Sequence, residues 1–176
     1  MIRTFALLAL AVVTLAGCAT ASRFDAAGDV HSLLVAIRDN DRTEFDRYVD
    51  RKALKQSIEG RLVRETSRAD MDDGARALAA VLAPGLADLA VDAMIRPEVF
   101  RAAANYYGYT PDKPIPDRLA IGGALKYLPD GRVCATKKKD GPCLLVFTNV
   151  EGTWKLSSFE GDLSDLRGKP KPRKTP

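Results

Sequence analysis

The chain has 176 residues, of which 46% are hydrophobic and 28% are charged, a composition that is typical of an ordinary globular protein and excludes global disorder. This length is enough for one domain with a proper core and too short for two. The formal net charge of +4 does not indicate a nucleic-acid binder, because residues 167–176 carry five basic residues and no acid, so the rest of the chain has no excess of positive charge.

The N-terminal residues have the pattern of an export signal. Arg3 provides a positive start, residues 5–15 form an almost unbroken apolar run, and Ala16 and Gly17 are small. The run is too short to span a bilayer comfortably. Leu15-Ala16-Gly17-Cys18 resembles the lipobox of bacterial lipoproteins, in which a peptidase cuts before the Cys and the Cys carries the lipid. The resemblance implies that residues 1–17 are a signal peptide and that Cys18 becomes the lipidated N-terminus.

The lipobox also implies a location. Lipoproteins of this type carry several acyl chains, and stable attachment requires more than one. An Asp directly after the Cys often favours the inner membrane, whereas Ala19 stands here, so we expect the outer membrane, facing the periplasm. Export argues against nucleic acid as a partner. The basic, Pro-rich residues 167–176 are expected to form a disordered tail, either simply solvated or weakly attracted to anionic polymers and lipids.

Three amphipathic helices are predicted at the start of a single folded domain over residues 28–166. Residues 18–27 are expected to form the lipidated Cys and a short tether, and Asp29 the N-cap of the first helix. Thr43 begins the second helix, and Asp50 caps a third over residues 51–67. The apolar residues recur at intervals of three and four and are expected to face the core: Val30, Leu33, Leu34, Ile37, Phe45, Tyr48, Val49, Leu54, Ile58 and Leu62.

A longer apolar-periodic stretch covers residues 73–95, in which Pro84-Gly85 must kink or split the helix. Pro97 is suited to the first turn of another short helix. That helix is expected to continue to about Tyr106, with Val99, Phe100 and Ala103 inward.

The C-terminal part is predicted to be an antiparallel β-meander. Residues 107–117 contain Gly and three Pro residues, which defeat both helix and central strand, and form the connector. After them the apolar period changes to two. Four strands are predicted, over residues 119–128, 132–136, 143–149 and 153–159, with Asp130-Gly131 and Glu151-Gly152 in tight turns. On the last hairpin, Leu145, Phe147, Trp154 and Leu156 are expected to share one inward face.

The two remaining cysteines are expected to form a disulfide. Lipidation uses Cys18, which leaves Cys134 and Cys143 as an even pair in an oxidising compartment. If the middle hairpin turns within residues 137–140 or one residue later, the two cysteines lie opposite each other, or nearly so, on neighbouring strands. A structural role is favoured over a redox role, because there is no Cys-x-x-Cys motif.

Residues 36–62 resemble the core of an uncharacterised bacterial family, the domain of unknown function DUF2939. The matching features are Ile37 followed by a short polar gap, a Tyr48-Val49-Asp50 triplet and a long Leu-rich helix pair that ends near Arg96-Pro97-Glu98, together with Phe45, Leu54, Ser57 and Leu62. The resemblance covers about the first two-thirds of the mature chain. It brings no catalytic residues.

The expected fold class is therefore α+β, with N-terminal amphipathic helices followed by a four-stranded antiparallel meander. This outline is similar to the cystatin-like and NTF2-like folds, in which a curved sheet wraps a long helix. The likeness implies a pocket between sheet and helices and says nothing about chemistry.

Candidate site residues are few. Asp50 either caps a helix or faces a pocket together with Tyr48. Tyr106, Tyr107 and Tyr109 place three phenols at the start of the connector, where they either line a ligand or partner surface or pack into the core and anchor the loop.

The sequence gives little support for a metal site, a nucleotide-binding loop or a Ser-His-Asp catalytic triad. His31 is the only histidine, so a two-His metal site is impossible. Asp70, Asp72 and Asp73 suit a helix N-terminus better than calcium, because no further ligands follow at fixed places. Gly122-Gly123 lies in a predicted strand and lacks the Lys of a phosphate loop. We therefore assign no catalytic residue, metal or cofactor.

The sequence predicts a lipid-anchored envelope protein that works by binding, either a small apolar ligand in a helix-sheet pocket or another envelope protein. The protein is expected to be attached to the membrane through the lipid on Cys18. The alternative is a periplasmic enzyme that uses Asp50 and the tyrosines as acid-base groups in the same pocket.

Overall fold

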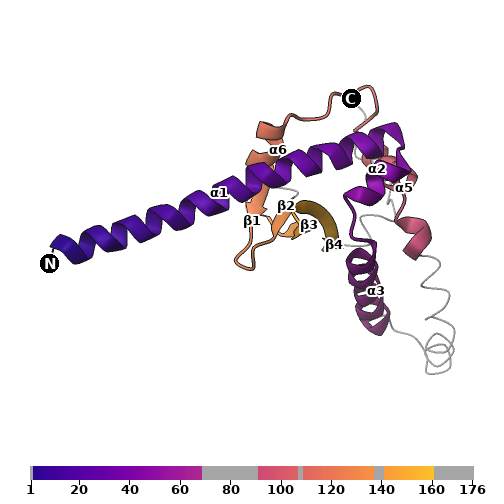
Figure 1. The fold of residues 1–176 in the computed structure, drawn as a ribbon. Helices are drawn as coiled ribbons and strands as arrows, with labels where there is room; N and C mark the ends of the chain where they lie inside the picture. Colours follow the sequence, from indigo (N-terminus) through magenta and orange to yellow (C-terminus); the bar gives the residue numbers. More distant parts are fainter. Residues whose placement is uncertain (1, 69–90, 107–108, 137–140, 161–176) are drawn as a thin grey trace, which may run out of the picture.

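The computed structural model describes residues 2–68, 91–106, 109–136 and 141–160. Helices precede a four-stranded antiparallel sheet, which confirms the α+β class. In Figure 1, α1 crosses the sheet and its N-terminal part extends beyond the body, whereas α3 lies toward the other end. The elements are α1 Ile2–Asp39, α2 Arg42–Arg47, α3 Arg51–Arg68, α5 Pro97–Tyr106, α6 Arg118–Ala124, β1 Leu125–Tyr127, β2 Val133–Thr136, β3 Cys143–Val150 and β4 Thr153–Phe159.

The sheet is the predicted meander, in the order β1-β2-β3-β4. Glu151 and Gly152 both have positive φ, 53° and 85°, which is the backbone that a two-residue type I′ hairpin requires. Gly131, at φ 86°, closes the first hairpin, where Leu128 donates its N–H to Arg132 O at 2.8 Å. Both turns therefore form where the sequence predicts them.

The outer edge of β4 is paired with other parts of the chain at Trp154 and Leu156. Val49 forms a parallel bridge with Leu156, because Leu156 N donates to Tyr48 O at 2.9 Å and Asp50 N donates to Leu156 O at 3.0 Å. Two residues earlier on β4, Trp154 N donates to Asp29 Oδ2 at 2.7 Å. Because these groups are paired within the chain, the edge is protected from pairing with another strand.

The core lies between α1 and the inward face of the sheet. The stripe predicted on α1 is confirmed, since Val30 and Leu33 are buried and Leu34 and Ile37 pack against the core. The inward face of the last hairpin is confirmed as well, with Leu145 packed against the core and the others buried. The largest fully buried side chains include Phe45, Phe147, Leu54, Ile95 and Leu156.

The expected tether is wrong, because residues 19–27 belong to α1. Ala26 and Ala27 are fully buried, and Asp29 is not an N-cap but an interior helical residue that pairs with the sheet edge. Phe24 is the single large apolar residue of the segment, too few to reveal a helical period, yet the alanines favour helix and allow close packing. The folded domain therefore begins earlier than residue 28, at about Phe24.

The strand predicted over residues 119–128 is also wrong in its first part. Asp117 caps a helix, α6, by accepting a hydrogen bond from Ala120 N at 2.8 Å, and only Leu125–Tyr127 forms a strand. Gly122-Gly123 therefore lies in a helix. The cap at Asp117 and the contact with α1 favour a helix over residues 118–124, which do not alternate between polar and apolar as a half-buried strand does.

The predicted start of α5 is confirmed, whereas the predicted start of α2 is wrong. Asp41, not Thr43, caps α2, since Asp41 Oδ1 accepts from Glu44 N at 3.0 Å. Pro97 begins α5 as predicted, but Val99 is 40% exposed instead of inward.

Other predictions lie outside what the structure describes. They concern the break after residue 68, most of residues 73–95 with Pro84-Gly85, the turn at residues 137–140, the side chain of Leu62, and the tail at residues 167–176.

Candidate functional site

An open groove of about 410 Å³ runs between α3 and the end of the β3–β4 hairpin. Ser57 on α3 fixes the helix to the strand, because its Oγ lies 2.7 Å from Ser158 Oγ and accepts from Phe159 N at 3.3 Å. The groove is lined by Gln56, Ser57, Gly60, Arg61 and Arg64 from the helix and by Pro142, Cys143, Ser158, Phe159 and Glu160 from the sheet side. Its volume suits a small chemical group, while its openness suits a group carried by a larger partner.

Two arginines dominate the chemistry of the groove. Arg61 and Arg64 are three residues apart, so they lie on one face of α3. The Arg61 guanidinium carbon lies 5.9 Å from the centroid of the Phe159 ring, in a cation–π arrangement. Arg61 Nε is buried and has no hydrogen-bond partner among the described residues. Guanidinium groups in this position fit a carboxylate or a phosphate, which they bind with two parallel hydrogen bonds.

Glu160, the acidic residue of the groove, is also coupled to a cation outside it. Its carboxylate contributes to raising the pKa of Arg132, which is raised mainly by the hydrogen bond of that side chain to Asp130. The Glu160 carboxylate thus interacts electrostatically with a residue that is not in the groove.

The disulfide lies at the sheet side of the groove. Cys134 and Cys143 are joined, with their Cα atoms 5.6 Å apart, which confirms the predicted pairing. They are offset rather than directly opposite, because Cys143 pairs with Thr136 and Cys134 with Val146, across a register shift between Ala135 and Thr136. The bond fixes the hairpin end that supplies Cys143 to the groove lining.

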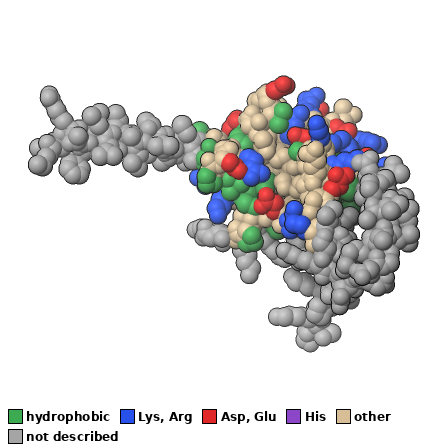
Figure 2. Space-filling model, turned by 90° about the horizontal axis from the view of Figure 1, so that it is seen from below, with side chains coloured by type: hydrophobic (Ala, Val, Ile, Leu, Met, Phe, Trp, Pro, Cys, Tyr) green, Lys and Arg blue, Asp and Glu red, His purple; other side chains and the backbone are tan. Residues whose placement is uncertain are grey.

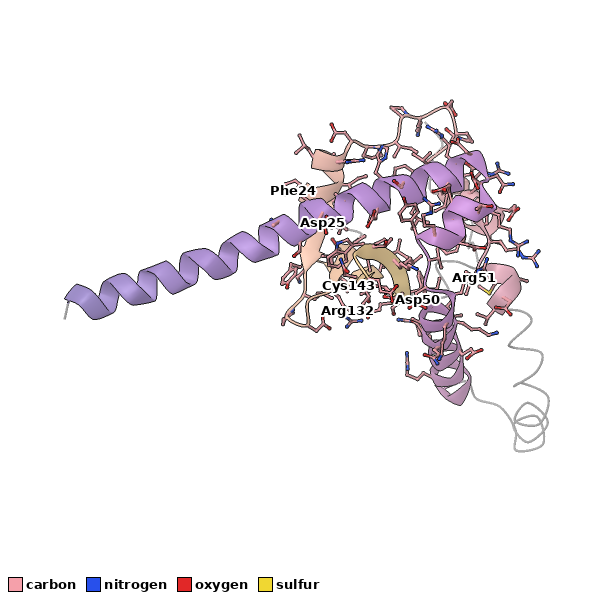
Figure 3. The ribbon with its side chains drawn as sticks, viewed as in Figure 1. Phe24, Asp25, Asp50, Arg51, Arg132 and Cys143 are labelled. Carbon is pink, nitrogen blue, oxygen red and sulfur yellow. A yellow bond between two sulfur atoms is a disulfide. The ribbon has the colours of Figure 1, made fainter. Side chains whose placement is uncertain are left out.

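Asp50 and Tyr48 do not line this groove. Asp50 Oδ1 accepts a hydrogen bond from Ala53 N at 3.0 Å, so its carboxylate caps α3 as the helix-cap interpretation expects. Figure 3 shows Asp50 and Arg51 where the chain passes from the sheet edge into that helix. Tyr48 is half-buried and packs against the core. The two residues therefore act in the fold rather than in a shared pocket.

The predicted tyrosine cluster is described only in part. Tyr109 is 67% exposed, and its backbone N donates to Ala104 O at 2.9 Å beyond the end of α5. The Tyr106 side chain and all of Tyr107 lie outside the described residues. His31 is half-buried in the interior of α1 rather than beside a tether.

A second, smaller hollow of about 210 Å³ lies between α1 and α2. Its carboxylates already have partners: Asp39 Oδ1 accepts from Arg38 Nε at 2.7 Å, and Asp41 caps α2. The hydrogen bond from Arg38 also lowers the pKa of Asp39. Within the described ranges, no group of three His, Cys, Asp or Glu residues is placed to hold a metal ion. No described helix is long and apolar enough to cross a membrane.

The groove is not evident from the sequence alone, because charged residues on an amphipathic helix, such as Arg61 and Arg64, ordinarily face solvent. A signal was present: Ser57, Gly60, Arg61 and Arg64 follow one another at helical spacing and mark a second, polar face beside the apolar stripe. That face reads as ordinary solvated surface until the last strand is known to lie against it.

Comparison with known proteins finds one family model, described as a protein of unknown function (DUF2939), which matches residues 8–103. The match includes the arginines of the groove and Asp50, and it ends before the sheet. No curated protein and no solved structure matches the chain.

Proposed function

The chain belongs to the DUF2939 family of proteins of unknown function, and from this premise we propose that it is a lipid-anchored accessory protein of the bacterial cell envelope. It binds an acidic segment of another envelope protein and catalyses no reaction. Cys18 carries the lipid, and the domain faces the periplasm from the outer membrane.

The anchor is supported by the sequence and by redox chemistry. Leu15-Ala16-Gly17-Cys18 has the lipobox pattern. The bond between Cys134 and Cys143 fits the oxidising envelope, where disulfides form and persist. Both observations are consistent with export of the whole domain.

The groove between α3 and β4 supports binding. The observation that carries the proposal is the pair of guanidinium groups in the groove wall, Arg61 and Arg64, with Arg61 over the Phe159 ring. A carboxylate that enters the groove can accept charge-assisted hydrogen bonds from these guanidinium groups, and such bonds are roughly twice as strong as neutral ones. An acidic segment therefore gains affinity here that a neutral one does not.

The same geometry favours a protein partner over a small apolar ligand and over an enzyme substrate. The groove is open, and serine hydroxyls and guanidinium groups form much of its wall. An apolar ligand needs an enclosed, mainly hydrophobic cavity. The carboxylate best suited to acid-base chemistry, Asp50, is engaged as a helix cap.

Site-specific photocrosslinking in intact cells tests this function. A photoreactive residue at Gln56, which is exposed at the groove, is expected to capture an envelope protein. Capture should be lost in Arg61→Gln and Arg64→Gln. Lys52→Gln is the matched control, because it removes one positive charge from an exposed position of the same helix that does not line the groove.

Two results contradict the proposal. Capture that persists in both arginine variants removes the role of the groove. Radiolabelled palmitate that fails to appear on the wild-type protein, or that still appears on Cys18→Ser, removes the anchor.

A further inference from the structure

The distance along the chain between Cys18 and the folded body is short. The backbone of α1 is helical throughout this segment. Phe24 is in contact with the body, because its ring covers Gly122 of α6, and Asp25 Oδ2 accepts from the indole Nε1 of Trp154 at 2.8 Å. Six helical residues at 1.5 Å per residue span about 9 Å. A lipid on Cys18 would therefore hold this end of the domain next to the head groups.

The same end carries exposed apolar side chains. Phe24 is 41% exposed and Leu119 is 73% exposed. Leu119 is three residues before Gly122 on α6, so it shares a face of that helix with the glycine that the Phe24 ring covers. The guanidinium of Arg118 lies against α1, 3.8 Å from where a Cβ at Gly28 would stand. The surface thus combines two apolar side chains with a cation that suits a phosphate head group.

The pictures place this surface where the helix leaves the body. Figure 3 labels Phe24 and Asp25 on α1 at that point, close to α6. In Figure 2, seen from another side, hydrophobic side chains gather at the end of the body from which the N-terminal part of the chain emerges. α3, which carries the groove, lies toward the opposite end in Figure 1.

We propose that the α1–α6 end, formed by Phe24, Arg118 and Leu119, lies against the surface of the bilayer in which Cys18 is anchored. This inference rests on the lipid anchor of the proposed function. The occupant is a lipid surface because the anchor, about 9 Å away along the helix, keeps the bilayer closer to these side chains than any diffusing partner. Apolar side chains at the acyl boundary add a second attachment to the lipid. α3, which carries the groove, then lies toward the end of the body away from the membrane.

Fluorescence of the full-length lipoprotein in liposomes tests the orientation. Leu119→Cys is labelled with a fluorophore in liposomes that contain a head-group nitroxide lipid. Val99→Cys, at a 40% exposed apolar position on α5, is the matched control. The added thiol is the reactive one, since Cys134 and Cys143 are joined and Cys18 carries lipid. The label at position 119 should lose most of its fluorescence, while the label at position 99 keeps it.

Each result has one meaning when palmitate incorporation is measured on the same samples. Palmitate present with selective quenching at position 119 supports the orientation. Palmitate present with equal signals at both positions overturns the orientation and leaves the anchor standing. Absence of palmitate overturns the anchor and, with it, this inference. Self-quenching at position 119 without nitroxide lipid means that a second copy covers the face, which also overturns the inference.

Position 119 is suited to this test because its side chain is largely exposed, so Leu119→Cys should leave the fold intact. As a second variant, Leu119→Asp with a label at the exposed Ala120→Cys should reduce quenching relative to Ala120→Cys alone. Unchanged quenching there would mean that the apolar side chain does not hold the domain on the membrane.

Discussion

Gly122→Ala measures how closely α6 packs on α1. A Cβ at this position would lie 2.5 Å from Phe24 Cδ1 and 2.8 Å from Cε1, whereas carbon atoms attract best at about 3.5–4.0 Å. Relief requires the ring to move or the helices to separate, and such overpacking costs about 1–3 kcal/mol. Alanine in a helix interior returns about 0.5–1 kcal/mol. We expect a net loss of about 1–2 kcal/mol in the free energy of unfolding.

The neighbouring glycine supplies the control. A Cβ at Gly123 meets nothing within 4 Å, so Gly123→Ala should gain about 0.5–1 kcal/mol from helix propensity alone. Urea unfolding followed by the fluorescence of Trp154, the single tryptophan, gives both values. Adding Phe24→Ala should abolish the loss caused by Gly122→Ala. Equal stability of Gly122→Ala and Gly123→Ala would refute the argument.

Three further outcomes follow from individual contacts. Asp50→Ala removes the cap of α3 and should cost about 1 kcal/mol in urea unfolding, with Asp50→Ser close to wild type. Replacing both Cys134 and Cys143 by Ser should lower the free energy of unfolding by roughly 2–3 kcal/mol, because the bond closes a short loop in the unfolded chain; an unchanged urea midpoint would contradict this. The hydrogen bond from Arg132 lowers the pKa of Asp130 from its ordinary value of 3.8. Its contribution to stability is therefore full above that ordinary value and is lost as the pH falls through the lowered pKa. An NMR titration of Asp130 should give a midpoint below 3.8, which Arg132→Gln moves back upward.

The sequence predicts an element correctly where residues within that element restrict its backbone. Residue types restrict the backbone at three such places: the strands after residue 132, the Glu151-Gly152 turn and the start of α5 at Pro97. Glycine tolerates positive φ, and proline tolerates the first turn of a helix, whatever the rest of the fold does. The same holds for Asp50, whose capping bond spans only three residues.

The sequence-based predictions are wrong where a contact between residues far apart in the sequence determines the local structure. Asp29 looks like a helix cap from its neighbours, but its carboxylate binds the backbone of Trp154, which lies 125 residues away. Residues 119–124 are predicted to begin a strand, yet they belong to a helix that packs on α1 at Phe24. A short segment has nearly equal local preferences, so tertiary contacts choose between them.

The sequence by itself determined the α+β order, the meander and the pairing of the two cysteines, because periodicity, turn residues and cysteine number act locally or by elimination. Only the tertiary structure decided that Arg61 and Arg64 face a groove. Their surroundings come from β4, about a hundred residues later, which Ser57 binds through Ser158 and Phe159. A helix surface is ordinary solvated surface until the fold brings a distant strand against it.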